Sequence, residues 1–347
     1  MWEEIRSNQI RSGILVASMA VLLLLIGYFL GLILLDSAVA GLIIAFIVWV
    51  ISVLIAFFQG DSILLAVSGA RKIGPDDHPR LYNVVEEMKI ASGLEKMPDV
   101  YIIEDPALNA FAAGRDPNRA AVAVTRGLLD KLNRDELQGV IAHEMAHIKN
   151  RDVLLMAVAA VLVGSIVLLA WYATRILFFR TAFGGRRGGG GGGLVQIILL
   201  IVGLVLIILA PIAARLIYFA ISRRREYLAD ASSALYTRYP EGLASALEKL
   251  ATSDTRVRAA NGATAPMYTI NPFQKKGRSM RELTSTHPPI AERIRILRSM
   301  AGASYKDYDS AYRKAGVGPG IIPPSALNSA GEAGIRAGQS PETGEKP

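Results

Sequence analysis

The hydrophobic positions of this chain are concentrated in four long runs, and polar residues fill the segments between them. The runs contain no charged residue and cover residues 14–35, 39–58, 153–172 and 194–214. An α-helix rises about 1.5 Å per residue, so each run can cross the roughly 30 Å hydrocarbon core of a bilayer. A helix in a soluble core seldom stays apolar on every side over such a length. The pattern therefore predicts four transmembrane helices.

The first two runs are separated by only three residues, Asp36–Ala38. Such a short connection joins antiparallel neighbours, so we expect a tight helical hairpin within residues 1–58. The small residues Ala38-Val39-Ala40 resemble a signal-peptidase site, but the first run has 22 residues, against about 7–15 in a signal peptide. We therefore predict that the first helix is retained.

Four crossings would place the N-terminus, residues 59–152 and everything after residue 215 on one side of the membrane. Cytoplasmic segments carry an excess of Lys and Arg. These segments agree with a cytoplasmic location through Arg6, Arg11, Arg71, Lys72, Lys149, Arg151, Arg223, Arg224 and Arg225. The loop between the third and fourth runs disagrees, because it contains four arginines before its six glycines, Arg175, Arg180, Arg186 and Arg187. The counts still favour the cytoplasm.

Composition narrows the classes of function. The chain is 52% hydrophobic and only 20% charged, which excludes an intrinsically disordered protein. It has no cysteine, so disulfides, zinc ribbons and thiol catalysis are excluded, and histidine chemistry must use His78, His143, His147 and His287. The net charge of +8 has no nucleic-acid-binding motif beside it, so we expect the basic surface to face anionic lipid headgroups and predict no nucleic-acid partner.

The strongest chemical signal is the H-E-x-x-H motif at His143–His147. Asn133 and Glu136 form a helix-start signal before it, so the motif should lie on a helix. Residues i and i+4 of a helix share one face, and both imidazoles can therefore bind one zinc ion. Glu144 is offset by about 100° and should reach a water molecule on the metal, take its proton and later pass it to the leaving amine.

A catalytic zinc with two histidines needs a third protein ligand and one open position. No histidine follows His147 by ten residues, where Ala157 stands, and His287 is the only histidine downstream. Glu226 and Asp230 have helical E-x-x-x-D spacing, so Glu226 could bind the metal while Asp230 orients His143 through its other ring nitrogen. Such pairs are common on solvated helices, and it is the missing ligand that makes Glu226 the leading candidate.

This arrangement resembles the HtpX-like heat-shock protease family of membrane gluzincin peptidases over residues 1–300. The resemblance lies in two apolar runs, HEMAH within Ala142–Asp152, two further runs and then REYLAD at residues 225–230. Two smaller signatures are Asn109-Ala110-Phe111-Ala112 and Thr286-His287-Pro288-Pro289-Ile290 with Arg293 after it.

The resemblance implies an α-helical multi-pass membrane protein with a mainly α (α+β) zincin-type metalloprotease domain carrying a small sheet. It implies one Zn²⁺ per chain and a zinc endopeptidase in the cell membrane, facing the cytoplasm, that cleaves misfolded or damaged membrane proteins. Combined with the hydrophobic pattern, this predicts two hairpins (1–58 and 153–221), two halves of the protease domain (59–152 and 222–300) and a flexible tail (301–347). The oligomeric state stays open.

Carried over residue by residue, the family pattern makes His143, His147 and Glu226 the zinc ligands and Glu144 the general base. The pattern implies that Asp230 contacts a zinc ligand and does not itself bind the metal.

Three further residues match functional positions of the family. Asn109 matches a contact to the substrate backbone, with an Asx turn as the alternative. His287 and Arg293 match positions near the substrate or the oxyanion of the transition state, where a donor would stabilise developing charge. His287 could equally be a turn residue before two prolines.

Two local features have no catalytic assignment from the sequence. His78 stands before Pro79 and looks like the entry to a helix. Residues 121–125 are small strand formers and could be an edge strand to which an extended substrate adds. The alternative is an internal strand beside residues 100–103.

Two other functions were weighed. A prenyl-protein-type zinc endopeptidase of the enclosed-chamber kind would have seven spans, against four predicted here. A non-catalytic zinc-containing membrane scaffold would normally have four protein ligands around its metal. The chain offers three good ligands and a correctly placed Glu144, which favours catalysis.

Overall fold

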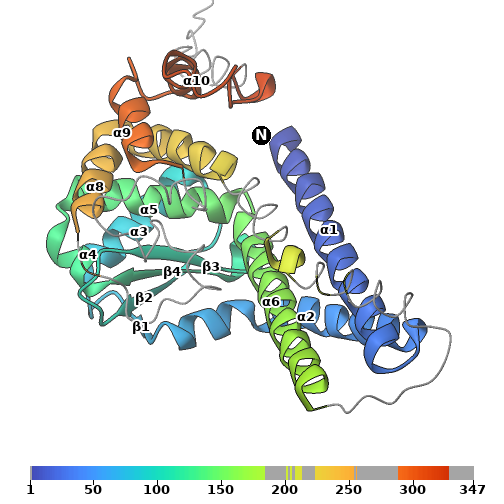
Figure 1. Cartoon of the computed structure of the whole chain (residues 1–347). Helices are drawn as coiled ribbons and strands as arrows, with labels where there is room; N and C mark the ends of the chain where they lie inside the picture. Colours follow the sequence, from blue (N-terminus) through green and yellow to red (C-terminus); the bar gives the residue numbers. More distant parts are fainter. Residues whose placement is uncertain are drawn as a thin grey trace, which may run out of the picture.

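The computed structural model describes residues 2–183, 201, 204, 208–212, 223–253, 255 and 288–327. Its centre is a four-stranded sheet with helices on both faces, and long helices extend from one side of it (Figure 1). The first two helices are α1 (Trp2–Leu34) and α2 (Ala38–Val67). They form the predicted hairpin, in which Asp36 has a φ of 50° and Ser37 caps α2.

Glycines let the two helices of this hairpin approach closely. A Cβ atom built on Gly41 would lie 2.1 Å from the carbonyl oxygen of Gly27 and 2.5 Å from the Cα atom of Gly31. No side chain fits at such distances, so the three glycines are required by the contact itself.

Two helices qualify as membrane spans by length and composition, within α1 at Val16–Leu34 and in α2 at Ala38–Val67. Only 33% and 17% of their most apolar windows are buried inside the protein, which is unlike the core helix of a soluble domain. α2 extends nine residues beyond the predicted end at residue 58.

The second predicted hairpin is only partly described. The third apolar run lies in α6 (Asp152–Phe183), whose described residues contain a shorter apolar stretch at Val161–Arg175. Most of the fourth run and the glycine-rich loop lie outside the described residues. The structure therefore supports a mostly helical protein with two candidate membrane helices, and four spans are not confirmed.

The sheet is mixed, with the order β1-β2-β4-β3. Its strands are β1 (Ala70–Ile73), β2 (Asp99–Ile103), β3 (Ala110–Gly114) and β4 (Ala120–Thr125). β4 pairs in parallel with β2 and antiparallel with β3. Of the two alternatives for residues 121–125, the internal strand beside residues 100–103 is therefore confirmed and the edge strand is wrong. A short connection through η1 (Pro117–Arg119) returns the chain antiparallel, and β3 covers the side of β4 that was expected to be free.

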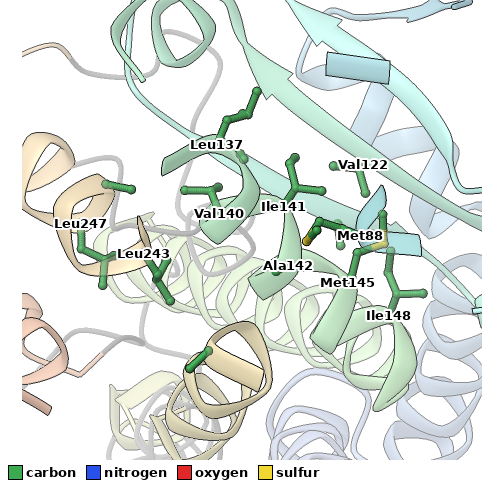
Figure 2. Packing of buried hydrophobic residues seen from close by; sticks show 14 of the residues in the cluster. Met88, Val122, Leu137, Val140, Ile141, Ala142, Met145, Ile148, Leu243 and Leu247 are labelled. Carbon is green, nitrogen blue, oxygen red and sulfur yellow. The ribbon is translucent and has the colours of Figure 1, made fainter. Parts of the chain in front are cut away.

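The main hydrophobic core lies between the sheet and the helices on one face. These helices are α3 (Pro79–Ser92), α4 (Arg126–Lys131), α5 (Arg134–Lys149) and α8 (Pro240–Thr252). Figure 2 shows α5 in the middle of this core, between Val122 of β4 and Leu243 of α8. His78 caps α3 by accepting a hydrogen bond from the Leu81 N–H, as its position before Pro79 predicted.

The other face of the sheet rests on α2. Leu64 and Leu65 at the end of this helix pack with Phe111 of β3 in a second, smaller cluster. Figure 1 shows α2 on the side of the sheet opposite α5.

The described part of the C-terminal region begins at residue 288 and includes the helices α9 (Ile290–Arg298) and α10 (Tyr305–Lys314). The flexible tail predicted from residue 301 is therefore wrong as far as residue 327. Tyr308, Ile321 and Ile322 join the main core, and this burial compensates for a composition rich in Gly, Pro and Ser. Residues from 328 on lie outside the described part.

Gly41→Ala should loosen the α1–α2 hairpin, because its Cβ atom would overlap backbone atoms. We expect the free energy of unfolding to fall by about 1–3 kcal/mol, seen as a lower thermal midpoint in detergent. Gly13→Ala is the matched control: nothing lies within 4 Å of its Cβ position, and alanine favours a helix by up to about 1 kcal/mol. Equal shifts in both variants would contradict the close contact.

Candidate metal centre

α5 presents the H-E-x-x-H motif inside the core. A capping box starts the helix: Asn133 accepts from the Glu136 N–H, and the Glu136 side chain accepts from the Asn133 N–H, as predicted. His143, Glu144 and His147 are at most 4% exposed.

The third candidate ligand comes from the helix of residues 223–237, which we call the ligand helix. It is held against α5 where Ser233 Oγ donates to the Gly139 carbonyl at 2.8 Å. A side chain on Gly139 would overlap the backbone of Leu243 in α8, so this glycine allows close packing around α5. Glu226 and Asp230 lie on the ligand helix with 3% and 0% of their surface exposed.

The three predicted ligands converge. His143 Nε2 and His147 Nε2 are 3.2 Å apart, and they lie 3.6 Å and 3.4 Å from the carboxylate oxygens of Glu226. In a tetrahedral zinc site with bonds of about 2.0–2.1 Å, two ligand atoms are roughly 3.3–3.4 Å apart. The donor set and its spacing therefore fit zinc.

Carboxylates behind the histidines fix which ring nitrogen faces the centre. His143 Nδ1 lies 3.0 Å from Asp230, and His147 Nδ1 lies 3.2 Å from Asp152. When each Nδ1–H donates to its carboxylate, both Nε2 atoms carry lone pairs that point at one another. A cation between them removes this repulsion, which is a second reason why the site fits a metal ion.

The same charges raise the pKa of both histidines above the ordinary value. Burial by itself would lower the pKa of His147, but the carboxylates of Asp152 and Glu226 outweigh it and raise the pKa to about 10. Burial also lowers the pKa of His143, but the interactions with the carboxylates of Asp230 and Glu226 are stronger and raise it. The centre therefore attracts positive charge, as a proton or as a metal ion.

Arg293 lies beside the carboxylates of the ligand helix. Its guanidinium is fully buried and donates two hydrogen bonds to Asp230, at 2.8 Å and 2.7 Å. It also lies 3.4 Å from Glu226. A group without exposed surface that binds these carboxylates can hold them in place. The role of Arg293 near the substrate or the oxyanion stays a prediction.

Two residues of the centre were missed from the sequence. Asp152 is the first residue of α6 and is 1% exposed, and Arg225 Nε lies 3.5 Å from its other carboxylate oxygen. Zinc-binding histidines almost always donate to a carboxylate, and Asp152 is the first carboxylate after His147 in the chain. This rule could have found it.

The remaining predicted residues are placed as follows. Asn109 is buried directly before β3, and its side-chain oxygen accepts from the N–H of the next residue, Ala110. Glu144 lies on α5 beside His143. His287 lies outside the described residues.

Comparisons with known proteins agree with this centre. Residues 75–301 match the family model described as Peptidase family M48. Proteins named Protease HtpX homolog are similar along most of the chain. The one from Dictyoglomus turgidum is 46% identical and covers 78% of this chain and 84% of its own. The one from Streptococcus pneumoniae (strain Hungary19A-6) is 43% identical and covers 86% and 100%.

Among solved structures, the crystal structure of S. mikatae Ste24p is similar with a TM-score of 0.47 and 18% identity. The match covers 86% of this chain and 67% of that chain.

Zinc binding should release protons. With a pKa of about 10, His147 is protonated at pH 7 when the metal is absent, and the proton must leave before Nε2 can bind zinc. Calorimetric titration in buffers with different ionisation heats should show at least one proton released per zinc at pH 7. The number should fall as the pH approaches 10. Proton uptake or no exchange would contradict the raised pKa.

Asp152→Asn keeps the shape of the side chain and removes the charge behind His147. We expect the dissociation constant for zinc to rise roughly 10–100-fold, the usual effect of losing such a partner. Asp130→Asn on the exposed end of α4 is the control and should leave zinc affinity unchanged. Competition with a chromophoric chelator measures the zinc affinity of both variants. Unchanged affinity in Asp152→Asn would show that Asp152 does not support zinc binding.

Proposed function

Because the chain belongs to peptidase family M48, and is therefore a membrane metalloprotease that uses zinc, we propose that it cleaves misfolded or damaged membrane proteins as a quality-control enzyme. The observation that supports this proposal is the buried cluster of His143, His147 and Glu226, with Glu144 on the same helix. It lies in a domain that continues directly into candidate membrane helices.

The proposed mechanism divides the reaction between these residues. His143, His147 and Glu226 would hold the metal, which when bound supplies a Lewis acid that makes a water molecule nucleophilic near neutral pH. Glu144 takes the proton of the attacking water and transfers it to the leaving amine. Asp230 and Asp152 keep the two imidazoles oriented, and Arg293 holds Asp230 and Glu226 in place.

Two further contacts belong to the proposal. Asn109 precedes β3, the strand at the end of the sheet, and would contact the substrate backbone there. His287 would donate to the oxyanion of the transition state, since charge develops on the scissile carbonyl oxygen during attack. The family resemblance of these two positions supports both assignments.

The substrate class and location are proposed from the same placement. A domain attached to membrane helices meets membrane proteins more often than soluble ones, because both are confined to one surface. The Lys and Arg residues of the polar segments favour the cytoplasmic side of the cell membrane. Residues 153–221 would form a second hairpin and complete a multi-pass protein.

Glu144→Gln should remove activity and keep the metal. Losing a general base lowers the rate by roughly 10²–10⁴-fold, whereas the three zinc ligands stay intact. We would measure cleavage of casein and of a membrane protein with a destabilised span by detergent-purified enzyme, with added zinc and with chelator. Glu95→Gln, an exposed residue, is the matched control and should cleave like the wild type.

The outcomes separate the alternatives. Cleavage of both substrates that is abolished by chelator and by Glu144→Gln, with zinc retained in the variant, supports the proposal. If a prenylated peptide is cleaved and these two substrates are not, the protein would be a prenyl-protein endopeptidase instead of a quality-control enzyme. Full activity in Glu144→Gln would refute the role of Glu144.

A further inference from the structure

The segment after the family match lies against the ligand helix. The match ends at residue 301, and the residues that follow form α10 and a return of the chain up to residue 327. We call residues 302–327 the C-terminal brace. Figure 1 shows α10 as an outer layer beyond α9.

The brace contacts the ligand helix at three places along its length. The ring of Tyr312 packs edge-on against the ring of Tyr227, with centroids 5.1 Å apart. Tyr305 Oη lies 3.1 Å from Ser232 Oγ. At the start of the ligand helix, Arg224 donates to the Ile321 carbonyl at 3.5 Å.

The brace is itself fixed by hydrogen bonds and burial. Asp309 accepts from the N–H groups of Ile321 and Ile322 at 2.7 Å and 3.1 Å, which ties the returning chain to α10. Both isoleucines are at most 6% exposed. A capping box at Ser304 and Asp307 starts α10. A segment with this many internal bonds can hold a neighbour in place.

Tyr308 lies on the same face of α10 as Tyr305 and Tyr312, because these residues are three and four positions apart in one helix. It is fully buried, and its hydroxyl has no hydrogen-bond partner among the described residues. Burial raises the pKa of its phenol well above the ordinary value, and the nearby charge of Asp230 raises it further, opposed by Arg293. Since Tyr305 and Tyr312 on this face both contact the ligand helix, the buried Tyr308 between them faces that helix as well.

We propose that the C-terminal brace positions the third zinc ligand, and that Tyr308 is its positioning residue. The ligand helix is packed between α5, through Ser233 and Gly139, and the brace, through Tyr305 and Tyr312. Metal ligands must be held within about 0.5 Å of their productive geometry, which needs support on both sides. The proposal concerns the zinc site and does not depend on the identity of the substrate.

The test uses the full chain in detergent. Tyr308→Ala leaves a cavity on the face of α10 that packs against the ligand helix, and we expect the dissociation constant for zinc to rise roughly 10-fold or more. Tyr308→Phe keeps the ring and should stay within about threefold of the wild type, because the hydroxyl makes no described bond. Zinc affinity is measured by chelator competition. On casein, kcat at subsaturating zinc should fall while KM changes little.

Matched controls separate positioning from general stability. Lys306→Ala is exposed on the same helix, and Tyr239→Ala makes the same substitution at a tyrosine that is 50% exposed. Both should keep wild-type zinc affinity. If Tyr308 has a purely structural role, Tyr308→Ala should lower the thermal midpoint by the same amount with and without zinc. If Tyr308 positions the ligand, Tyr308→Ala should lower the midpoint more in the presence of zinc, because the bound metal stabilises the variant less than the wild type.

If Tyr308→Ala fails to fold, Tyr312→Leu decides the question. This substitution keeps an apolar side chain and removes the ring contact with Tyr227, so zinc affinity should fall several-fold. A folded Tyr308→Ala, or a folded Tyr312→Leu in its place, with wild-type zinc affinity would overturn the proposal. Wild-type protein that binds zinc without cleaving casein would refute the proposed function and leave this test intact.

Discussion

The ion pair between Asp230 and Arg293 is the interaction on which the rest of the metal centre depends. Both side chains are fully buried, and an unpaired charge in that place would cost several kcal/mol. Through this pair α9 acts on two ligands at once, because Asp230 lies 3.0 Å from His143 and Arg293 lies 3.4 Å from Glu226. Among the described residues, the buried charged groups of the centre have a formal charge of −2, which a divalent cation neutralises. They are the carboxylates of Glu144, Asp152, Glu226 and Asp230 and the guanidinium groups of Arg225 and Arg293. The ligands therefore become a site only when segments far apart in the sequence have folded together.

Features that depend on helical spacing could be predicted from the sequence. The i, i+4 relation of His143 and His147, the same relation of Glu226 and Asp230, and the capping box at Asn133 all follow from one helix period. The family match extends over residues 75–301, and the zinc ligands lie within it. Local geometry and family resemblance together gave the three ligands that the structure brings together.

Features that depend on long-range pairing could not be predicted. Whether β4 is an edge or an internal strand depends on where β3 returns, and Ala110–Gly114 has no alternation that reveals it. Arg293 looks like any cation on an amphipathic helix until Asp230 is known to face it. The segment after residue 301 has the composition of a flexible tail, yet Tyr308 and Ile321 find an apolar surface on the rest of the fold. Each of these outcomes was decided by a partner distant in sequence.

α2 has a consequence for where a peptide bond can be cut. The helix has 30 residues and is about 45 Å long, roughly 15 Å more than the hydrocarbon core of a bilayer. The last residues of the helix pack against the sheet, where Leu64 and Leu65 contact the cluster that contains Phe111. Ile63 and Val67 at the same end of the helix are exposed. In the proposed membrane placement, this helix would set the height of the domain above the bilayer, with the exposed helix end at the level of the lipid headgroups. A polypeptide that leaves the bilayer near that height would then be within reach whatever its sequence, and distance from the membrane would itself select substrates.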